Sequence, residues 1–536
     1  MTSSLPSRLT PSSIRGTTLF AAGTTLVHIA VAVFHGGPVA VPDIPSYLQF
    51  AYGTGGQAVP SPTSYHPGYG LLLRPLTLVG INGLDLHQAA LVFNALLAGL
   101  CVYLTTIFAS RLRLSPRLSA MCAAIAALYP GLSAASRIAW PETLLCAAVL
   151  GSAILAHDQT PRKNLFLGLL SGLLFSVHPR AIVVTAALIV LGALMPSKQL
   201  RRPLVIGGVL GWVVSATVIF QTDTWQQTRV KAAKESTAIF EVIASGLGQL
   251  TAVAVSSVGL GLLGVLMSLA TVSQVVRRKS LLDPDAASRV YLGIGFLAMV
   301  ALGGVALAGS QRIDTAIYGR YIDPWVLPLI VIAIAGLKPR PTKSQLRQLT
   351  WSFAAGIVVM AFAMSNLGES PRRIMTLSTG WIWEATDQVK IFTLITVAIV
   401  VFVAVIGRTV PGKTAEILIG TLLLCSAAST VMNHTHLAEV GEIAEGQAST
   451  AVFVPETISC LAHDVATTKP YTPSLYQLTL PHIQHRRVDL AAGEQPCSAY
   501  LIAGFDVPDK CPNARLVAKE IRGQWGLWYN PDEECD

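Results

Sequence analysis

The residues of this 536-residue chain that could do chemistry are a few carboxylates and arginines beside long apolar stretches. Asp43 stands alone in a long segment between two apolar runs, and Glu142 follows Arg137 by five residues. Arg180 and Arg320 each lie next to an apolar run. A carboxylate can accept the proton of a hydroxyl group, and arginine can hold phosphate oxygens through paired, charge-assisted hydrogen bonds.

The composition identifies the elements that must position these side chains. Hydrophobic residues make up 52% of the chain and charged residues only 12%, against roughly 25% charged in a soluble protein. So few charges could not cover the surface of a soluble protein of this length, and so much apolar surface excludes disorder. We therefore predict a polytopic α-helical membrane protein. The net charge of +9 is then explained by the membrane, and we expect no nucleic-acid partner.

Apolar runs of bilayer-spanning length predict about 13 transmembrane helices. They cover residues 18–34, 87–110, 118–134, 142–156, 165–177, 181–195, 204–220, 250–276, 292–308, 325–337, 351–364, 391–406 and 417–432. The segment 1–432 is thus predicted to be a membrane domain, and residues 433–536 a soluble one.

The distribution of basic residues predicts the topology. With a cytoplasmic N-terminus, every second loop between spans becomes cytoplasmic, and each of these loops carries Lys or Arg, as the positive-inside rule requires. This predicts an odd number of spans, with the N-terminus inside the cell and the C-terminal domain outside. The chain would be a multi-pass protein of the plasma membrane.

The segment after residue 432 has mixed polarity and strand-like runs at 452–458, 498–505, 516–521 and 525–529, the last two able to pair. We expect a small extracytoplasmic α/β domain there. Its cysteines are Cys460, Cys497, Cys511 and Cys535. An even number in an exported domain indicates two disulfides, with three connectivities open.

Ionisable side chains are almost absent from the middles of the predicted spans, and His28 is the main exception. Transporters usually keep charged residues near the midplane, where the substrate is held. Here the charges lie at span ends and in loops predicted to be outside. This layout indicates a site at the membrane surface that handles a polar group attached to a lipid.

The first outer loop, residues 35–86, contains Asp43 and the sequence Tyr65-His66-Pro67-Gly68-Tyr69. Asp43 could also be a turn or helix-capping residue, and the aromatic stretch an interfacial turn. The apolar run 69–81 is too short to span, so we expect it at the interface or leading into the next span.

These motifs resemble those of the GT-C membrane glycosyltransferases, which use polyprenyl-phosphate sugars as donors. Protein O-mannosyltransferases, lipid A aminoarabinose transferases, and actinobacterial mannosyl- and arabinosyltransferases belong to this family. Asp43, with Tyr47 four residues later, matches the acid of the first outer loop that acts on the acceptor. His66-Pro67-Gly68-Tyr69 and the leucines after it are similar to a second motif. Many relatives carry two adjacent acids where Asp43 stands alone.

Three further matches involve arginines. Arg137 and Glu142 have the spacing of the arginine and acid that open the fourth span, where the arginine contacts the donor phosphate. Arg180 ends an apolar run after Pro179, the reverse of the family's Arg-Pro order. Tyr318 and Arg320 open a segment similar to the family's Arg-Tyr-x-x-Pro entry to a late span.

The resemblance implies a glycosyltransferase that moves a sugar from a polyprenyl-phosphate carrier to a glycan, lipid or protein acceptor outside the cell. Asp43 would be the general base of an inverting displacement, with Glu142 a second catalytic candidate. The donor phosphate would bind to Arg137, with Arg180, Arg312 and Arg320 as further candidates. Substrate contacts are expected from Tyr47, Tyr65, His66 and Tyr318. Each arginine could instead be a headgroup anchor.

Other interpretations of the sequence remain open. A transporter or flippase of a lipid-linked sugar is the main alternative, and a structural scaffold a weaker one. No cofactor is certain, and a divalent metal ion is left open. Asp283 with Asp285, or His434 and His436 with His482 or His485, could be metal ligands, although such residues are more often surface side chains.

Overall fold

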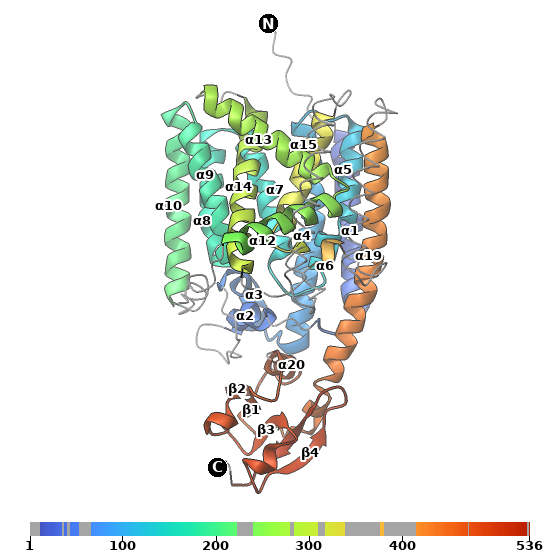
Figure 1. Ribbon diagram of the computed structural model, residues 1–536, viewed down its shortest axis with the longest axis vertical. Helices are drawn as coiled ribbons and strands as arrows, with labels where there is room; N and C mark the ends of the chain where they lie inside the picture. The colour runs from blue at the N-terminus through green and yellow to red at the C-terminus, as the bar shows by residue number, and fades with distance from the viewer. Residues whose placement is uncertain are drawn as a thin grey trace.

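The computed structural model describes residues 11–34, 37–39, 43–52, 66–221, 239–278, 283–308, 317–337, 376–379, 414–469, 471–532 and 535. A bundle of helices forms most of the molecule, and a small C-terminal domain lies at one end of it (Figure 1). The N-terminus is at the opposite end (Figure 1). Seven of the described helices are long and apolar enough to cross a membrane. The predicted polytopic helical architecture is therefore confirmed.

The membrane helices follow the predicted apolar runs closely. They are α1 (Pro11–Phe34), α4 (Gly83–Arg111), α5 (Pro116–Leu128), α6 (Pro130–Ala135), α7 (Glu142–Asp158), α8 (Pro161–Val177), α9 (Ile182–Leu194), α10 (Lys198–Gln221), α12 (Ile239–Ser256), α13 (Leu260–Arg278), α14 (Pro284–Leu307), α15 (Asp323–Gly336) and α19 (Thr414–Gly446). Three of these helices begin at a residue that caps them. Ser115, Thr160 and Asp283 cap α5, α8 and α14 with their side chains, each followed by proline at the first helical position.

Three predicted spans differ from the structure. The run 118–134 is divided by Pro130 into α5 and α6, because proline cannot continue the hydrogen bonding of α5. The run 250–276 is two helices, α12 and α13, because Val258 (φ 48°) and Gly259 (φ 82°) adopt left-handed backbone conformations that end α12. The last span continues to Gly446 as α19, beyond the predicted boundary at residue 432. The predicted spans 351–364 and 391–406 lie outside the described residues.

Helices α8 and α10 approach closely through glycines spaced four apart. A Cβ atom on Gly168 would lie 2.1 Å from the carbonyl oxygen of Leu204, and one on Gly172 would lie 2.4 Å from the backbone nitrogen of Trp212. Gly207 and Gly211 make the matching approach from α10. Small residues at such spacing allow membrane helices to pack backbone to backbone. The packing fixes α8, whose C-terminal end is followed by the turn that contains Arg180.

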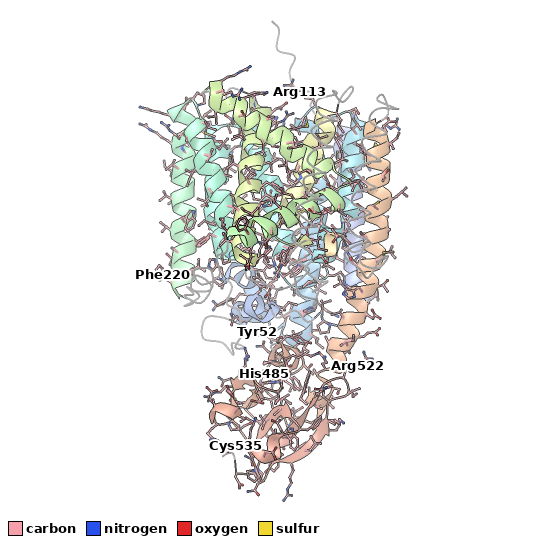
Figure 2. All side chains as sticks on the ribbon, in the orientation of Figure 1. Tyr52, Arg113, Phe220, His485, Arg522 and Cys535 are labelled. Atoms are coloured by element: carbon pink, nitrogen blue, oxygen red, sulfur yellow. A yellow bond between two sulfur atoms is a disulfide. The ribbon has the colours of Figure 1, made fainter. Side chains whose placement is uncertain are left out.

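The first loop lies at the end of the bundle that faces the C-terminal domain. It forms α2 (Ile44–Leu48), η1 (Gln49–Tyr52) and α3 (Gly68–Leu78) there (Figure 1). Tyr52 marks this end, and Arg113, from a loop predicted to be cytoplasmic, marks the other (Figure 2). The loop and the C-terminal domain thus share one side, as predicted.

The C-terminal domain is a small α/β unit, as predicted. Its strands β1 (Cys460–Asp464), β2 (Gln484–Val488), β3 (Tyr500–Gly504), β4 (Arg515–Lys519) and β5 (Trp525–Tyr529) form one sheet in the order β2-β1-β3-β5-β4. Strand β1 is parallel to β2 and β3, whereas β5 is antiparallel to β3 and β4. Helix α20 (Thr472–Thr479) connects the parallel pair β1 and β2. The predicted β4–β5 pairing is confirmed.

One predicted strand is wrong. Residues 452–458 form no strand; the 3₁₀ helix η6 (Ser449–Phe453) overlaps their start. The buried positions Ala448, Ala451 and Val454 recur every three residues, the period of a 3₁₀ helix, and Pro455 lacks a donor for a strand ladder. Strands β1 and β2 were not predicted. The polar sequence Gln484-His485-Arg486-Arg487 of β2 lacks strand-like residues.

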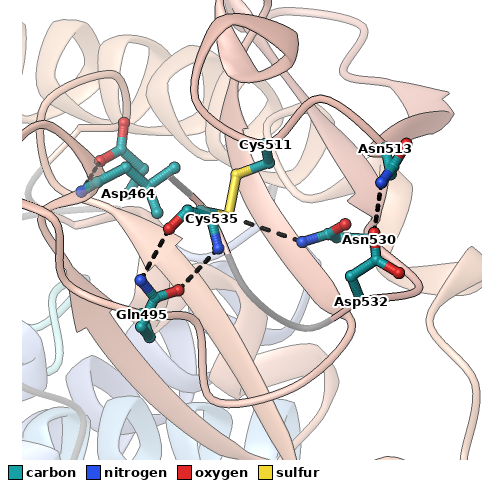
Figure 3. Close-up of a disulfide and its surroundings, with 8 residues drawn as sticks. Asp464, Gln495, Cys511, Asn513, Asn530, Asp532 and Cys535 are labelled. Atoms are coloured by element: carbon teal, nitrogen blue, oxygen red, sulfur yellow. Dashed lines mark hydrogen bonds between the residues drawn. A yellow bond between two sulfur atoms is a disulfide. The ribbon is translucent and has the colours of Figure 1, made fainter.

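Two disulfides hold the domain, and their connectivity is Cys460–Cys497 and Cys511–Cys535, with Cα atoms 5.9 and 4.4 Å apart. Figure 3 shows the second. Gln495 brackets Cys535 there: its amide donates to the carbonyl oxygen of Cys535 and accepts from the backbone nitrogen, both at 2.8 Å. The disulfide therefore fixes the chain end against the sheet.

Removing the second disulfide tests its contribution. Replacing Cys511 and Cys535 together with serine is expected to destabilise the C-terminal domain by about 3 kcal/mol, because the bond closes a loop of sequence separation 24. The measurement is the denaturant midpoint at which protease cleaves this domain in the full chain. Cys425→Ser, at a free cysteine, is the matched control. Equal midpoints for the double variant and the control would contradict this.

A buried histidine pair links β1 and β2. His463 Nε2 lies 3.0 Å from His485 Nδ1, and His485 Nε2 lies 3.2 Å from the carbonyl oxygen of Leu480. The carbonyl can only accept, so His485 donates from Nε2 and accepts at Nδ1 from His463. Burial lowers the pKa of His485 to about 4, and burial with the nearby charges of His485 and Arg487 lowers the pKa of His463 well below its usual value.

The histidine pair makes stability depend on pH. Both folded pKa values lie below the ordinary 6.5, so the unfolded chain binds more protons, and stability is full above pH 6.5 and falls as the pH drops toward about 4. At pH 5, His485 alone should cost about 2 kcal/mol. Protease resistance of this domain at pH 7 and pH 5 measures the loss, which His485→Gln should reduce. A wild-type chain equally resistant at both values would contradict the prediction.

Candidate active site

Four helix ends bring the candidate residues together on the side of the bundle nearest the C-terminal domain. Asp43 directly precedes α2, and Glu142 is the first residue of α7. Arg180 lies in the 3₁₀ turn η2 (Pro179–Ala181), and Arg320 comes just before α15. A carboxylate in the first turn of a helix is favoured by the helix dipole, which suits Glu142. All four side chains are buried.

The four side chains form one charge network. Arg320 Nη1 donates to Asp43 Oδ2 and Arg320 Nε to Glu142 Oε1, both at 2.5 Å. Arg180 Nη2 donates to the same Glu142 oxygen at 2.7 Å. Among the described residues, Glu142 Oε2 has no hydrogen-bond partner. Two buried arginines and two buried carboxylates from distant segments are thus held in direct contact.

Aromatic rings and a further acid surround the network. The Arg320 guanidinium lies 4.2 Å from the ring centre of Trp140, and that of Arg180 lies 5.2 Å from that of Tyr321. A small cavity beside Arg320 and Glu142 is lined by Trp140 and by Asp323, whose Oδ1 accepts a hydrogen bond from Tyr129 at 2.7 Å. Sequence reasoning missed Asp323, although it lies between the Arg-Tyr and Pro of the recognised Arg-Tyr-x-x-Pro motif.

The predicted aromatic contacts lie close to the network. The Tyr47 ring centre is 6.1 Å from that of Tyr69 and 6.3 Å from that of His178. Tyr318 packs edge to face on Tyr321 at 4.8 Å. His66 Nδ1 contacts the carbonyl oxygen of Phe175, which holds the start of α3 against α8. Tyr65 and Arg312 lie outside the described residues.

Arg137 takes a different position from Arg180 and Arg320. It is 2% exposed, and its Nη1 donates to the carbonyl oxygen of Val31 in α1 at 3.0 Å. The neighbouring Ser136 hydroxyl lies 2.9 Å from His28 Nδ1. The described contacts of Arg137 therefore connect α1 to the turn before α7.

Residues of the alternative metal motifs make other contacts in the structure. Asp283 caps α14, and Asp285 lies 3.0 Å from His157 Nε2. His434 lies in α19, with Nε2 3.1 Å from the Ser133 hydroxyl. Within the described ranges, no three histidine, cysteine, aspartate or glutamate side chains are grouped to hold a metal ion.

The fold is of the GT-C type, so the fold implied by the sequence motifs is confirmed. In particular, the chain is similar to ArnT from Cupriavidus metallidurans in the apo state (TM-score 0.55, 14% identity) and bound to undecaprenyl phosphate (TM-score 0.56, 15% identity). Each comparison covers 96% of this chain and 98% of ArnT. No protein-family model and no curated protein sequence matches the chain.

Proposed function

We propose that this protein is a membrane glycosyltransferase that moves a sugar from a polyprenyl-phosphate carrier to an acceptor outside the cell. The observation that carries the proposal is the network in which Arg320 joins Asp43 and Glu142 and Arg180 joins Glu142. It combines a group that can take a proton with groups that can hold a phosphate. The similarity to ArnT, which binds undecaprenyl phosphate, supports the choice of carrier.

The proposed reaction is a single displacement. The acceptor hydroxyl oxygen forms a bond to the anomeric carbon, and its proton passes to the Asp43 carboxylate. The bond from that carbon to the phosphate oxygen breaks, and its electron pair stays on the carrier phosphate. Attack opposite the leaving group inverts the anomeric centre. Because the phosphate leaves as an anion, bound guanidinium groups stabilise it as charge develops.

Arg180 and Arg320 are the phosphate ligands that we favour, with Arg137 and Arg312 as further candidates. Within the network both favoured arginines contact carboxylates, so the donor phosphate would have to replace part of these contacts. Such an exchange would release Asp43 from Arg320 when the donor binds. Asp43 would then be free to accept a proton only when a donor is bound beside it. This would limit its protonation in the absence of substrate.

A divalent metal ion is not required by this proposal. Asp43 and Glu142 could bind one, but each already contacts a guanidinium group, a charge pattern that suits an anion better than a cation. We therefore assign no step to a metal. The division into a membrane domain, 1–432, and an extracytoplasmic domain, 433–536, is also part of the proposal, as is location in the plasma membrane.

The test is sugar transfer by the purified chain in detergent. Radiolabelled pentosyl- and hexosyl-phosphopolyprenol donors are incubated with envelope glycan, lipid and peptide acceptors, and label released from the carrier is followed into each. Transfer to any acceptor supports the proposal. Movement of intact labelled carrier across the wall of a proteoliposome, without transfer, would instead favour the flippase alternative.

A further inference from the structure

A second, larger cleft separates the membrane domain from the C-terminal domain. Its volume is about 810 Å³, and its walls come from the outer ends of α1, α4 and α19, from η6 and α20, and from Arg522. Figure 2 shows Arg522 beside the lower end of α19, at the level where the two domains meet. The domains touch on both sides of this cleft.

Close backbone contacts hold the two walls in place. A Cβ atom on Gly83, at the start of α4, would lie 2.5 Å from the carbonyl oxygen of Leu478 in α20. On the other side, a Cβ atom on Gly37 would lie 2.9 Å from the carbonyl oxygen of Gly441 in α19. A side chain at Gly83 would push α20 away from α4, and one at Gly37 would push the first loop away from α19. The cleft is therefore a fixed feature of the fold.

His87 links the cleft to the candidate active site. It is 3% exposed, lines the cleft, and its Nε2 has no hydrogen-bond partner among the described residues. It also lines a small pocket shared with Ile44, the residue after Asp43. A buried polar atom without a partner is costly, so a ligand atom at this point would be stabilising.

The charges of the cleft indicate which ligand it can take. Its charged side chains are Glu442, Glu445 and Arg522, two carboxylates against one guanidinium. An acceptor carrying several phosphates would be repelled there. Gln88, Ser449 and Thr479 add neutral hydrogen-bonding groups to the wall. Sugar hydroxyls both donate and accept, so they match carboxylates, amides and imidazole together.

We propose that this cleft holds the acceptor, and that the acceptor is a neutral glycan chain whose hydroxyl groups bind His87 and the cleft wall. The inference rests on the proposed function, because it supplies the acceptor for the same transfer. His87 acts as a positioning residue: it holds the sugar unit of the acceptor next to the segment that carries Asp43. Selectivity against phosphorylated acceptors would come from Glu442 and Glu445.

The test measures binding of labelled probes to the full chain in lipid nanodiscs. The probes are short neutral manno- and arabino-oligosaccharides and their phosphorylated counterparts. We expect the wild-type chain to bind a neutral probe and to bind phosphorylated probes at least about 10-fold more weakly. His87→Ala should weaken neutral-probe binding about 10-fold. Gln88→Trp, at an exposed position that can accept a large side chain, should block the cleft and do the same.

Charge variants test the selectivity. Glu442→Gln combined with Glu445→Gln should raise the affinity for phosphorylated probes, and Glu456→Gln, an exposed acid outside the cleft lining, is the control. Polyprenyl-phosphate binding is measured on every variant and should not change. If the wild-type chain does not bind the carrier, the proposed function itself is contradicted. Normal carrier binding with tighter binding of phosphorylated probes, or with no effect of Gln88→Trp, would overturn only the acceptor inference.

Discussion

Asp43→Asn should lower the rate of sugar transfer by about 10²- to 10⁴-fold, the usual contribution of a general base. The amide keeps the shape of the carboxylate but cannot take the proton of the acceptor hydroxyl. Its oxygen can still accept the hydrogen bond from Arg320 Nη1, so the fold should be retained. The measurement is single-turnover transfer from a labelled polyprenyl-phosphate donor, together with the Kd for polyprenyl phosphate.

The Kd for polyprenyl phosphate distinguishes a catalytic role of Asp43 from a structural one. If Asp43 only positioned Arg320, its replacement would mainly change carrier binding. We expect carrier affinity to be retained or increased, because Arg320 loses a competing negative charge. Asp85→Asn, at an exposed acid in the first turn of α4, is the matched control and should keep normal transfer. Turnover by Asp43→Asn at the wild-type rate would refute the assignment of Asp43 as base.

Arg320→Met is expected to destabilise the protein by about 3–5 kcal/mol, because it leaves Asp43 and part of Glu142 buried without their cation. The same variant should weaken polyprenyl-phosphate binding by about 10- to 100-fold, as a charged hydrogen-bond donor to the phosphate is lost. Thermal unfolding in detergent and carrier binding measure the two effects separately.

Two further variants test the explanation of the Arg320→Met effect. Arg117→Met breaks an exposed contact with Glu416, with nitrogen and oxygen 3.9 Å apart, and should change stability by less than about 1 kcal/mol. Adding Asp43→Asn to Arg320→Met should restore part of the stability, because an unpaired charge is removed. If the double variant is no more stable than Arg320→Met alone, the two residues do not act as a buried pair.

The sequence predicted what depends on local composition. Apolar length located the helices, and the even number of tail cysteines predicted two disulfides. Their pairing could not be predicted, because it depends on how β1, β3 and the chain end meet in space. The division of residues 250–276 was missed because Val258 and Gly259 interrupt the helix inside an unbroken apolar run. Hydropathy does not detect a change in backbone handedness.

The candidate site was predicted residue by residue but not as a network. Motif order indicated Asp43, Glu142, Arg180 and Arg320 separately, and it ranked Arg137 first as the phosphate ligand. No spacing in the sequence indicated that Arg320 would contact both Asp43 and Glu142, residues 277 and 178 positions away. Contacts over such separations are set by the packing of the whole bundle, which a sequence pattern does not contain.

The location of the phosphate in a complex with polyprenyl phosphate tests the central claim most directly. A structure of the full chain with the added carrier would show it. We predict that the phosphate lies on the side of the bundle nearest the C-terminal domain, bonded to Arg180 or Arg320, with Asp43 facing it across the cavity. A phosphate bound elsewhere, or along a path through the centre of the bundle with Asp43 far away, would contradict the transferase account and favour transport.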